Sequence, residues 1–212
     1  MSIISGGIDF ILHLDKYLNV FISNYGIWVY AILFFIILIE TGLVVTPFLP
    51  GDSLIFAAAA FAVSGALNIG VLLILLSLAA IIGDTLNYNI GKYLGRKLLE
   101  KGDSKFIKKE YIDKTNAYYD KYGGKTIVLA RFIPIVRTFA PFVAGIGSMK
   151  YKQFIAYNAV GGIVWVSVVS TLGFFFGNIP FIKNNFSMIF IAIILISIIP
   201  IIITGIRGKL VS

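Results

Sequence analysis

Four ionisable side chains lie within apolar stretches of the sequence, where charged residues are rare. Glu40 and Asp52 belong to one stretch, and Arg131 and Arg137 belong to a second, "RFIPIVRTFAPFVAG" at 131–145. At the centre of a bilayer each charge costs about 2.5–3.5 kcal/mol, so four unpaired charges would cost on the order of 10 kcal/mol or more. Because two acids and two bases sum to zero, contact between the two stretches would remove much of that cost.

The residue types indicate an anion site with a proton or cation site beside it. Guanidinium groups suit bidentate phosphate binding, so Arg131 and Arg137 are predicted to hold the phosphate of a lipid headgroup. Helices expected to restart after Asp52 and near Pro141 would direct their N-terminal dipoles at the same anion. A carboxyl group removed from water takes up a proton readily, so Glu40 and Asp52 are predicted to bind a coupling H+ or Na+. The alternative is two structural ion pairs that only fix how the stretches dock, although buried pairs seldom add net stability.

The composition is that of an integral membrane protein. Of 212 residues, 58% are hydrophobic and 13% are charged, and the mean hydropathy is +0.94. Soluble domains are about one quarter charged. A helix needs about 20 apolar residues to cross the hydrocarbon core. Three runs are long enough and are predicted to be transmembrane helices: 69–90, 154–176 and 186–206.

Two residue counts exclude whole classes of chemistry. The sequence has no cysteine, which excludes disulfides, thiolate catalysis and cysteine metal sites. His13 is the single histidine, so a multi-histidine metal centre is excluded as well. We therefore expect no metal and no cofactor, only a coupling H+ or Na+.

Two stretches broken by proline and glycine, 27–63 and 126–147, are predicted to be re-entrant helical hairpins. In the first, a helix is interrupted at Glu40 and then by a Pro/Gly turn, and "SLIFAAAAFAV" after the turn is only about half a span long. Such backbone is tolerated at membrane depth only where protein or water surrounds it. An amphipathic helix at 8–23 is predicted to lie in the membrane interface. The predicted hairpin-tip residues are Pro47, Pro50, Gly51, Pro134, Pro141 and Gly145.

The basic residues give the orientation of these elements. The segment at 92–125 contains ten Lys/Arg and five acidic residues, which places it in the cytoplasm by the positive-inside rule. Lipid headgroups explain this basic excess more simply than nucleic acid does, so no nucleic-acid partner is expected. The two hairpins then enter from opposite faces of the membrane, which is typical of an inverted-repeat transporter. The predicted fold is an all-α, multi-pass domain in the cell (cytoplasmic) membrane.

A fifth ionisable residue, Asp84, is a secondary candidate. It stands in "GDTLNY", near the cytoplasmic end of the predicted span 69–90. Two interpretations are open: a functional carboxylate, or a carboxylate at the interface that pairs with Lys92 or Arg96. The neighbouring Asn87 and Tyr88 are interpreted as packing and interface residues.

Several segments resemble the bacterial DedA family of membrane proteins. They are "ETGLVVTPFLPGDSLIFAAAAFA", "GDTLNYNIGKYLGRK" and "RFIPIVRTFAPFVAGIGSMKYKQFIAYNAVGGIVW". The family shares a domain with eukaryotic lipid scramblases of autophagy. The resemblance implies two opposed re-entrant hairpins and a role in membrane-lipid homeostasis, with undecaprenyl phosphate recycled by some members and proton-dependent fitness linked to others. It also implies dependence on the acids at Glu40 and Asp52 and the arginines at Arg131 and Arg137.

The leading interpretation is a transporter that moves a lipid phosphate between leaflets, with undecaprenyl phosphate as the expected substrate. A proton-coupled antiporter for cations or drugs and a passive phospholipid scramblase are the alternatives within transport. An intramembrane aspartyl protease could use the "PGD" and "GD" aspartates, but it would leave the arginines unexplained, and an enzyme is not expected. A purely structural membrane organiser and assembly into homo-oligomers are left open. The expected partners are membrane lipids, through an anionic polyprenyl phosphate or phospholipid headgroup.

Overall fold

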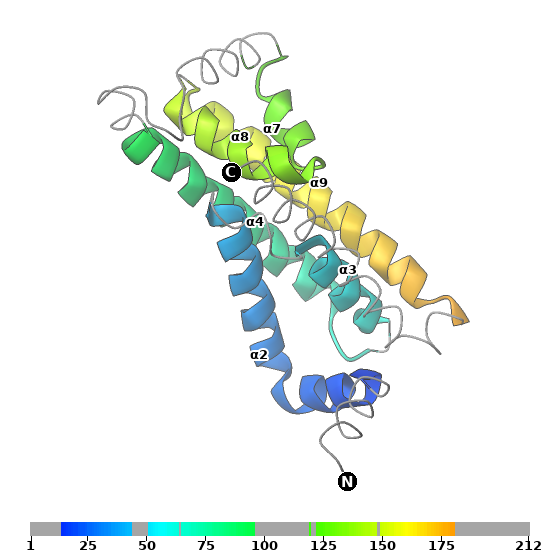
Figure 1. Cartoon of the computed structure of the whole chain (residues 1–212). Helices are drawn as coiled ribbons and strands as arrows, with labels where there is room; N and C mark the ends of the chain where they lie inside the picture. The colour runs from blue at the N-terminus through cyan, green and yellow to red at the C-terminus, as the bar shows by residue number, and fades with distance from the viewer. Residues whose placement is uncertain are drawn as a thin grey trace, which may run out of the picture. The chain divides into compact units, whose positions relative to one another are not determined.

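A computed structural model describes residues 14–43, 51–63, 65–95, 119, 122–147 and 149–180. Within these residues every element is a helix, which confirms the predicted all-α fold class (Figure 1). The predicted span 186–206 lies outside the described residues, as do most of the basic segment 92–125 and the start of the interfacial helix 8–23. The elements are α2 (Leu14–Gly42), α3 (Gly51–Ala62), α4 (Ile69–Ile90), the π-helical η1 (Gly91–Gly95), α7 (Lys125–Ala130), α8 (Pro134–Ile146) and α9 (Tyr151–Gly177).

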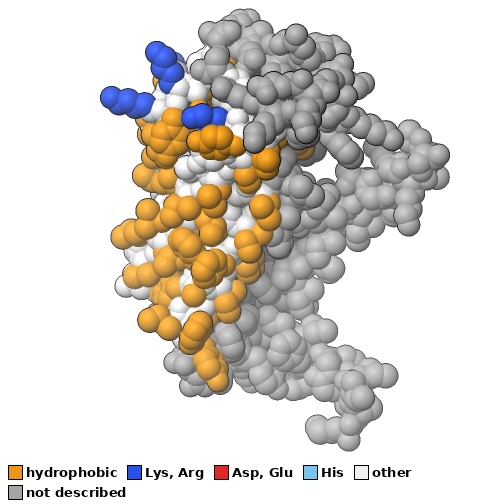
Figure 2. All heavy atoms as spheres, turned by 90° about the vertical axis from the view of Figure 1, so that its left-hand side faces the viewer, with side chains coloured by type: hydrophobic (Ala, Val, Ile, Leu, Met, Phe, Trp, Pro, Cys, Tyr) orange, Lys and Arg blue, Asp and Glu red, His pale blue; other side chains and the backbone are white. Residues whose placement is uncertain are grey.

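Three described helices are long and apolar enough to cross a membrane. They are Tyr25–Gly42 with 18 residues, and Ile69–Gly95 and Tyr151–Gly177 with 27 residues each. The second and third contain the predicted spans 69–90 and 154–176. On the face shown in Figure 2, hydrophobic side chains cover much of the described surface, while Lys and Arg side chains gather at one end. This distribution suits helices that pass through lipid and end at water.

Helix α2 covers two predicted elements, the interfacial helix 8–23 and the start of the stretch 27–63. The backbone leaves helical geometry at Tyr25 (φ −126°, ψ 26°), so α2 is two helices joined at a kink, and Gly26 beside it lowers the helix propensity there. The second helix does not stop at Glu40 but continues to Gly42. A glutamate is a good helix former, and a neutralised one needs no break in the helix. The re-entrant arrangement of 27–63 and 126–147, and the inverted repeat, stay predictions.

The chain forms two compact units, and α2, α4 and α9 each contribute a segment to both. The first unit comprises Met1–Leu33, Pro50–Leu73 and Val168–Ser212. Within it, α3 and the end of α9 approach closely through glycine: a side chain at Gly173 would meet the Phe56 carbonyl, and one at Gly177 would meet the backbone of Ala60. The buried face of α3 consists largely of alanines, which allows this approach.

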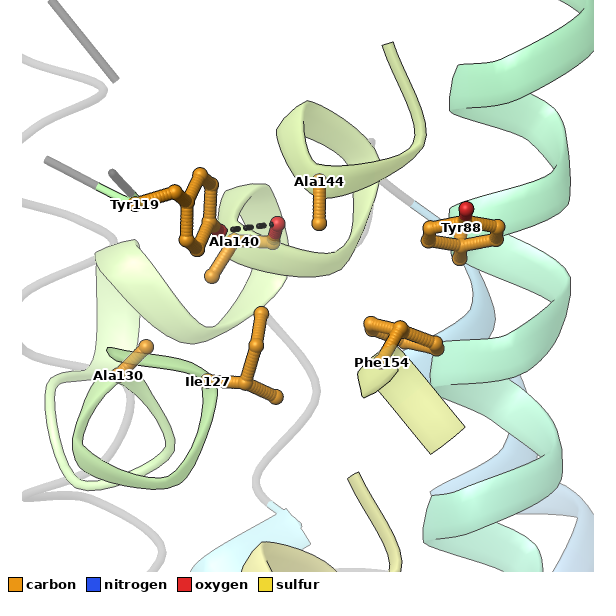
Figure 3. Close-up of a cluster of buried hydrophobic side chains, with 7 residues drawn as sticks. All are labelled: Tyr88, Tyr119, Ile127, Ala130, Ala140, Ala144 and Phe154. Carbon is orange, nitrogen blue, oxygen red and sulfur yellow. Dashed lines mark hydrogen bonds between the residues drawn. The ribbon is translucent and has the colours of Figure 1, made fainter. Parts of the chain in front are cut away.

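The second unit comprises Phe34–Leu49 and Ile74–Ser167. Its core, shown in Figure 3, is a cluster of buried side chains from α4, α7, α8 and α9 together with Tyr119. The rings of Tyr88 and Phe154 stack with centroids 4.4 Å apart, and the Tyr119 hydroxyl donates a hydrogen bond of 2.7 Å to the Ala140 carbonyl. Burial, reinforced by the negative charge of Asp84, raises the pKa of Tyr119, which keeps this hydroxyl protonated as a donor.

Helix α8 packs directly against the backbone of α4 and η1. Side chains at Gly91 and Gly145 would meet the carbonyls of Phe142 and Tyr88, so only glycine permits the observed separation. Gly91 lies on η1 and Gly145 on α8, so each helix presents a glycine to a carbonyl of the other. This reciprocal contact fixes the position of α8 along α4.

The turn between α7 and α8 is made by Arg131, Phe132 and Ile133, and α8 begins at Pro134. Proline fits this first position because the first-turn N–H groups have no helical partner. The expected restart near Pro141 is wrong: α8 continues through Pro141 to Ile146, with Gly145 also inside the helix. A proline removes one helical hydrogen bond, and the tight packing of α8 holds the helix together across it. Among the other predicted tip residues, Gly51 is the first residue of α3, and Pro47 and Pro50 lie outside the described residues.

We expect Gly91→Ala to destabilise the protein by about 1–3 kcal/mol, because its methyl group would push α8 away from η1. Gly26→Ala is the matched control, since nothing lies within 4 Å of its added Cβ. The measurement is the midpoint of thermal unfolding of the purified protein in detergent. Equal midpoints for the two variants would contradict the proposed role of the glycine contact.

Candidate functional site

Four charged side chains are buried among the described residues of the second unit. Glu40 comes from α2, Asp84 from α4, Arg131 from the turn after α7 and Arg137 from α8, and each is between 4% and 8% exposed. Thr41, Thr138 and Trp165 line the same small cavity as Asp84 and the two arginines. Two acids and two bases lie at one buried place and their charges sum to zero; Asp84 among them was the secondary candidate of the sequence analysis.

The structure shows which acid meets which arginine. Arg137 Nη2 donates to Glu40 Oε1, and Arg131 Nη2 donates to Asp84 Oδ2 at 2.5 Å. Asp84, the secondary candidate of the sequence analysis, is therefore the carboxylate bonded to Arg131. The interpretation of Asp84 as an interfacial carboxylate paired with Lys92 or Arg96 is wrong, because Asp84 is 4% exposed and its partner is Arg131.

Asp52 lies in the first unit and is exposed, in the first turn of α3. A carboxylate there interacts favourably with the positive end of the helix dipole, which is a sufficient structural reason for its presence. The predicted approach of Asp52 to the arginines stays a prediction.

Arg131 is held by more than its carboxylate. Its Nη2 also donates to Asn158 Oδ1 at 2.5 Å and lies 3.5 Å from the Ala80 carbonyl oxygen. In the part of the chain that the structure describes, Arg131 Nε has no hydrogen-bond partner although it is buried. A guanidinium with a free buried N–H can donate a hydrogen bond to a further oxygen without losing its present bonds.

Asn87 joins three helices at the site. It is fully buried, and its Nδ2 donates to the carbonyls of Thr41 at 3.2 Å and Thr138 at 2.8 Å. Because Thr41 follows Glu40 and Thr138 follows Arg137, this amide fixes the two segments that carry one ion pair. Tyr88 packs in the core, as predicted, and its hydroxyl donates to the Met149 carbonyl.

Trp165 provides an aromatic wall. The guanidinium carbon of Arg137 lies 4.7 Å from its ring centroid, and that of Arg131 lies 6.0 Å away. Both distances fall within the range of a cation–π interaction. Sequence reasoning missed Asn158 and Trp165, although a polar residue inside the apolar run 154–176 was a usable signal.

The cavity between these groups leaves about 10 Å³ for the centre of a water molecule, which corresponds to about one water. A phosphate group does not fit in that space. The structure is thus a closed arrangement in which each arginine is neutralised by a carboxylate. Among the described residues, no three acidic or histidine side chains gather into a metal site.

Comparison with known proteins shows to which family the chain is related. A family model described as the VTT domain matches residues 49–175. Protein DedA of Escherichia coli (strain K12) is 52% identical over 211 residues, which is 99% of this chain and 96% of that protein. The chain belongs to the DedA family of membrane proteins. The resemblance stated from the sequence is confirmed, and with it the assignment to a membrane.

Other relatives of this DedA-family chain are more distant. An uncharacterized membrane protein of Mycobacterium tuberculosis (strain ATCC 25618 / H37Rv) is 42% identical over 174 residues, or 81% of this chain and 76% of that protein. Inner membrane protein YghB of Escherichia coli (strain K12) is 33% identical over 157 residues, or 74% and 72%. No solved structure gives a significant match. The VTT match includes Asp84, Arg131 and Arg137, whereas Glu40 precedes it.

We expect Asp84→Asn to destabilise the protein by about 3–5 kcal/mol, because it leaves the Arg131 charge buried without a counter-charge. Adding Arg131→Gln should restore part of the lost stability, since the double variant buries no net charge. Asp52→Asn is the exposed control, with an expected loss of about 0.3–1 kcal/mol from the α3 N-terminus. Denaturant unfolding in detergent of the parent, both single variants Asp84→Asn and Arg131→Gln, the double variant and the Asp52→Asn control measures the coupling. Additive losses at Asp84 and Arg131 would contradict a direct pair.

Proposed function

We propose that this DedA-family protein is a transporter that moves a lipid phosphate between membrane leaflets. The proposed substrate is undecaprenyl phosphate. In the proposal Arg131 and Arg137 bind the phosphate, and H+ or Na+ is the coupling ion. The observation that carries it is the pair of buried arginines, each neutralised by a carboxylate around one small cavity. Family membership supports a role in the membrane, and buried charges in membrane segments mark transport pathways by default.

The proposed mechanism is an exchange of anions at the guanidinium groups. A carboxylate and a phosphate compete for the same donors, and a guanidinium binds either of them through paired N–H groups. Protonation of Glu40 removes its charge and releases Arg137 to the phosphate. The unpartnered Nε of Arg131 offers a further donor to the same ligand.

Charge balance sets how many coupling ions the cycle needs. The site has two acids and two bases and is neutral as it stands. A phosphate monoester carries about −1.5 to −2 charges at pH 7. To bind it without a buried net charge, the site must neutralise up to two carboxylates, and among the described residues Glu40 and Asp84 are bonded to the arginines. Asp52 is kept in the proposal as a further coupling-ion residue, as the sequence analysis suggested.

The cavity has to open for binding. It now admits about one water, so the headgroup can enter only if the helices that carry the ion pairs separate. Rearrangement of two broken-helix repeats is the way in which transporters of this type switch access between the two sides of the membrane. The polyprenyl chain can stay in lipid throughout, so only the headgroup needs a polar path.

The test is uptake of a short-chain polyprenyl phosphate into proteoliposomes, with and without a proton or sodium gradient. We expect gradient-dependent uptake by the parent protein, and a loss of at least about tenfold in Arg137→Ala, which removes a charge-assisted donor worth about 1.5–3 kcal/mol. Lys152→Ala is the control, because it removes an exposed positive charge away from the site.

Other outcomes of the same assay would contradict the proposal. Equal movement of ordinary phospholipids without a gradient would indicate a scramblase. Proton flux driven by an added cation, with no lipid movement, would indicate an antiporter. In that case the carboxylates would bind the transported ions and the arginines would only act as their counter-charges. Full transport by the swapped pair Glu40→Arg/Arg137→Glu would reduce this contact to a structural ion pair.

We expect Glu40→Gln to uncouple transport from the gradient. Glutamine is neutral at every pH and imitates the protonated acid, so downhill lipid exchange should persist while gradient-driven accumulation falls to the level without a gradient. Accumulation and exchange are measured in the same proteoliposomes, with Asp52→Asn beside it to show whether that acid contributes as well. Accumulation by Glu40→Gln at the parental level would remove Glu40 from the coupling step.

A further inference from the structure

One face of α9 contacts both arginines. Asn158, Gly161, Gly162 and Trp165 stand at positions i, i+3, i+4 and i+7, so they lie on a single stripe of the helix. All four are in the second unit, and we call them the arginine cradle. The sequence "NAVGGIVW" contains the whole stripe within an otherwise apolar span.

Asn158 presents a fixed oxygen to Arg131. Its Nδ2 donates to the Ile81 carbonyl at 3.0 Å and lies 3.4 Å from Thr85 Oγ1, whose own proton is donated to the same carbonyl at 2.7 Å. With the amide nitrogen held by two acceptors on α4, Oδ1 has to face the guanidinium. The opposite orientation would set the amide N–H groups against the N–H groups of Arg131 and an oxygen against the Ile81 carbonyl.

The two glycines leave the space through which the Arg131 side chain passes. A Cβ at Gly161 would lie 3.1 Å from Arg131 Cδ and 3.2 Å from Nε, and a Cβ at Gly162 would lie 3.5 Å from Nη2. The first two distances are tighter than ordinary van der Waals contact. Glycine at 161 and 162 therefore sets where the guanidinium can lie between α9 and α4.

Trp165 completes the stripe with a neutral surface. It is 3% exposed, and its ring faces Arg137 at 4.7 Å and Arg131 at 6.0 Å. An aromatic face attracts a desolvated cation without neutralising its charge. The amide oxygen of Asn158 acts in the same way, as an acceptor that carries no charge.

We propose that the arginine cradle is a positioning surface that keeps both guanidinium groups in place when their carboxylates release them to an anionic headgroup. The contacts of the cradle are uncharged, so they persist when Glu40 and Asp84 change charge, and they do not compete with phosphate as a further carboxylate would. Its residues act through Arg131 and Arg137 and need not touch the ligand. The inference rests on the proposed function, since it assigns the cradle to the same site.

The first test separates headgroup affinity from maximal rate. We expect Asn158→Leu and Trp165→Leu to raise the KM for a short-chain polyprenyl phosphate about tenfold, the equivalent of ~1.4 kcal/mol for a lost cation–π contact or hydrogen bond. Trp165→Phe, which keeps an aromatic face, should recover most of the affinity. Ile163→Leu is the control, because Ile163 is exposed on another face of α9. An unchanged KM in both leucine variants would overturn the inference and leave the proposed function standing.

The second test needs no transport. The chain has two tryptophans, Trp28 and Trp165, so Trp28→Phe leaves Trp165 as the single fluorophore. In that background we expect Arg137→Met to change the Trp165 emission, and Lys152→Met to leave it unchanged. Adding the short-chain polyprenyl phosphate to the Trp28→Phe protein should change the Trp165 emission. The same addition should have no effect when Arg131 or Arg137 is also substituted.

The two tests distinguish failure of the cradle from failure of the function. If the parent protein moves no lipid phosphate but Trp165 emission depends on Arg137, the positioning contact stands and the proposed substrate is wrong. If lipid phosphate is moved and Trp165 emission is indifferent to Arg137, the cradle is overturned. Where a leucine variant fails to fold, Trp165→Phe and Asn158→Gln keep the KM test decisive, and the emission test needs no leucine variant.

Discussion

Neutralisation of buried charge is the constraint on which the second unit depends. Arg131 and Arg137 are buried among apolar helices, and each lies against a carboxylate of a different helix. Losing one partner would leave a buried charge, at a cost of about 3–5 kcal/mol, comparable with the whole stability of many domains. The positions of α2, α4 and α8 are therefore tied together by charge as well as by packing.

Close backbone contact makes this pairing possible. The Gly91 and Gly145 contacts bring α8 against α4 and η1, and Gly83 brings the α2 backbone within reach of α4, since a side chain there would meet Leu38 O at 2.9 Å. In lipid the hydrophobic effect does not drive helices to associate, so close packing at small residues and polar contacts hold them together. Asn87 adds the polar contact, and the two ion pairs lie where the glycine contacts have already brought the helices together.

Sequence reasoning predicted the two spans 69–90 and 154–176 and named all four of these charged residues among its five candidates, because apolar length and isolated charges are local signals. Asp84 was only a secondary candidate because it stands near basic residues at a helix end, whereas Asp52 lies beside a Pro/Gly turn. Which face of α4 meets the turn after α7 is decided by contacts such as that of Gly145 with Tyr88. No pattern within one segment shows that contact, so neither Asp84 nor Asn158 could be assigned to Arg131 in advance.

A site neutralised by its own carboxylates has a consequence for the proposed cycle. While Glu40 and Asp84 occupy the arginines, they act as internal substitutes for the headgroup, and the cavity of about 10 Å³ excludes free phosphate. An anion can enter only if a carboxylate leaves, and a carboxylate leaves at low cost only if a cation or proton neutralises it. Ligand and coupling ion are thus linked by electroneutrality without any direct contact between them. The uncharged contacts of Asn158 and Trp165 are what such a cycle requires, because they are the contacts to the arginines that need not change when the charges do.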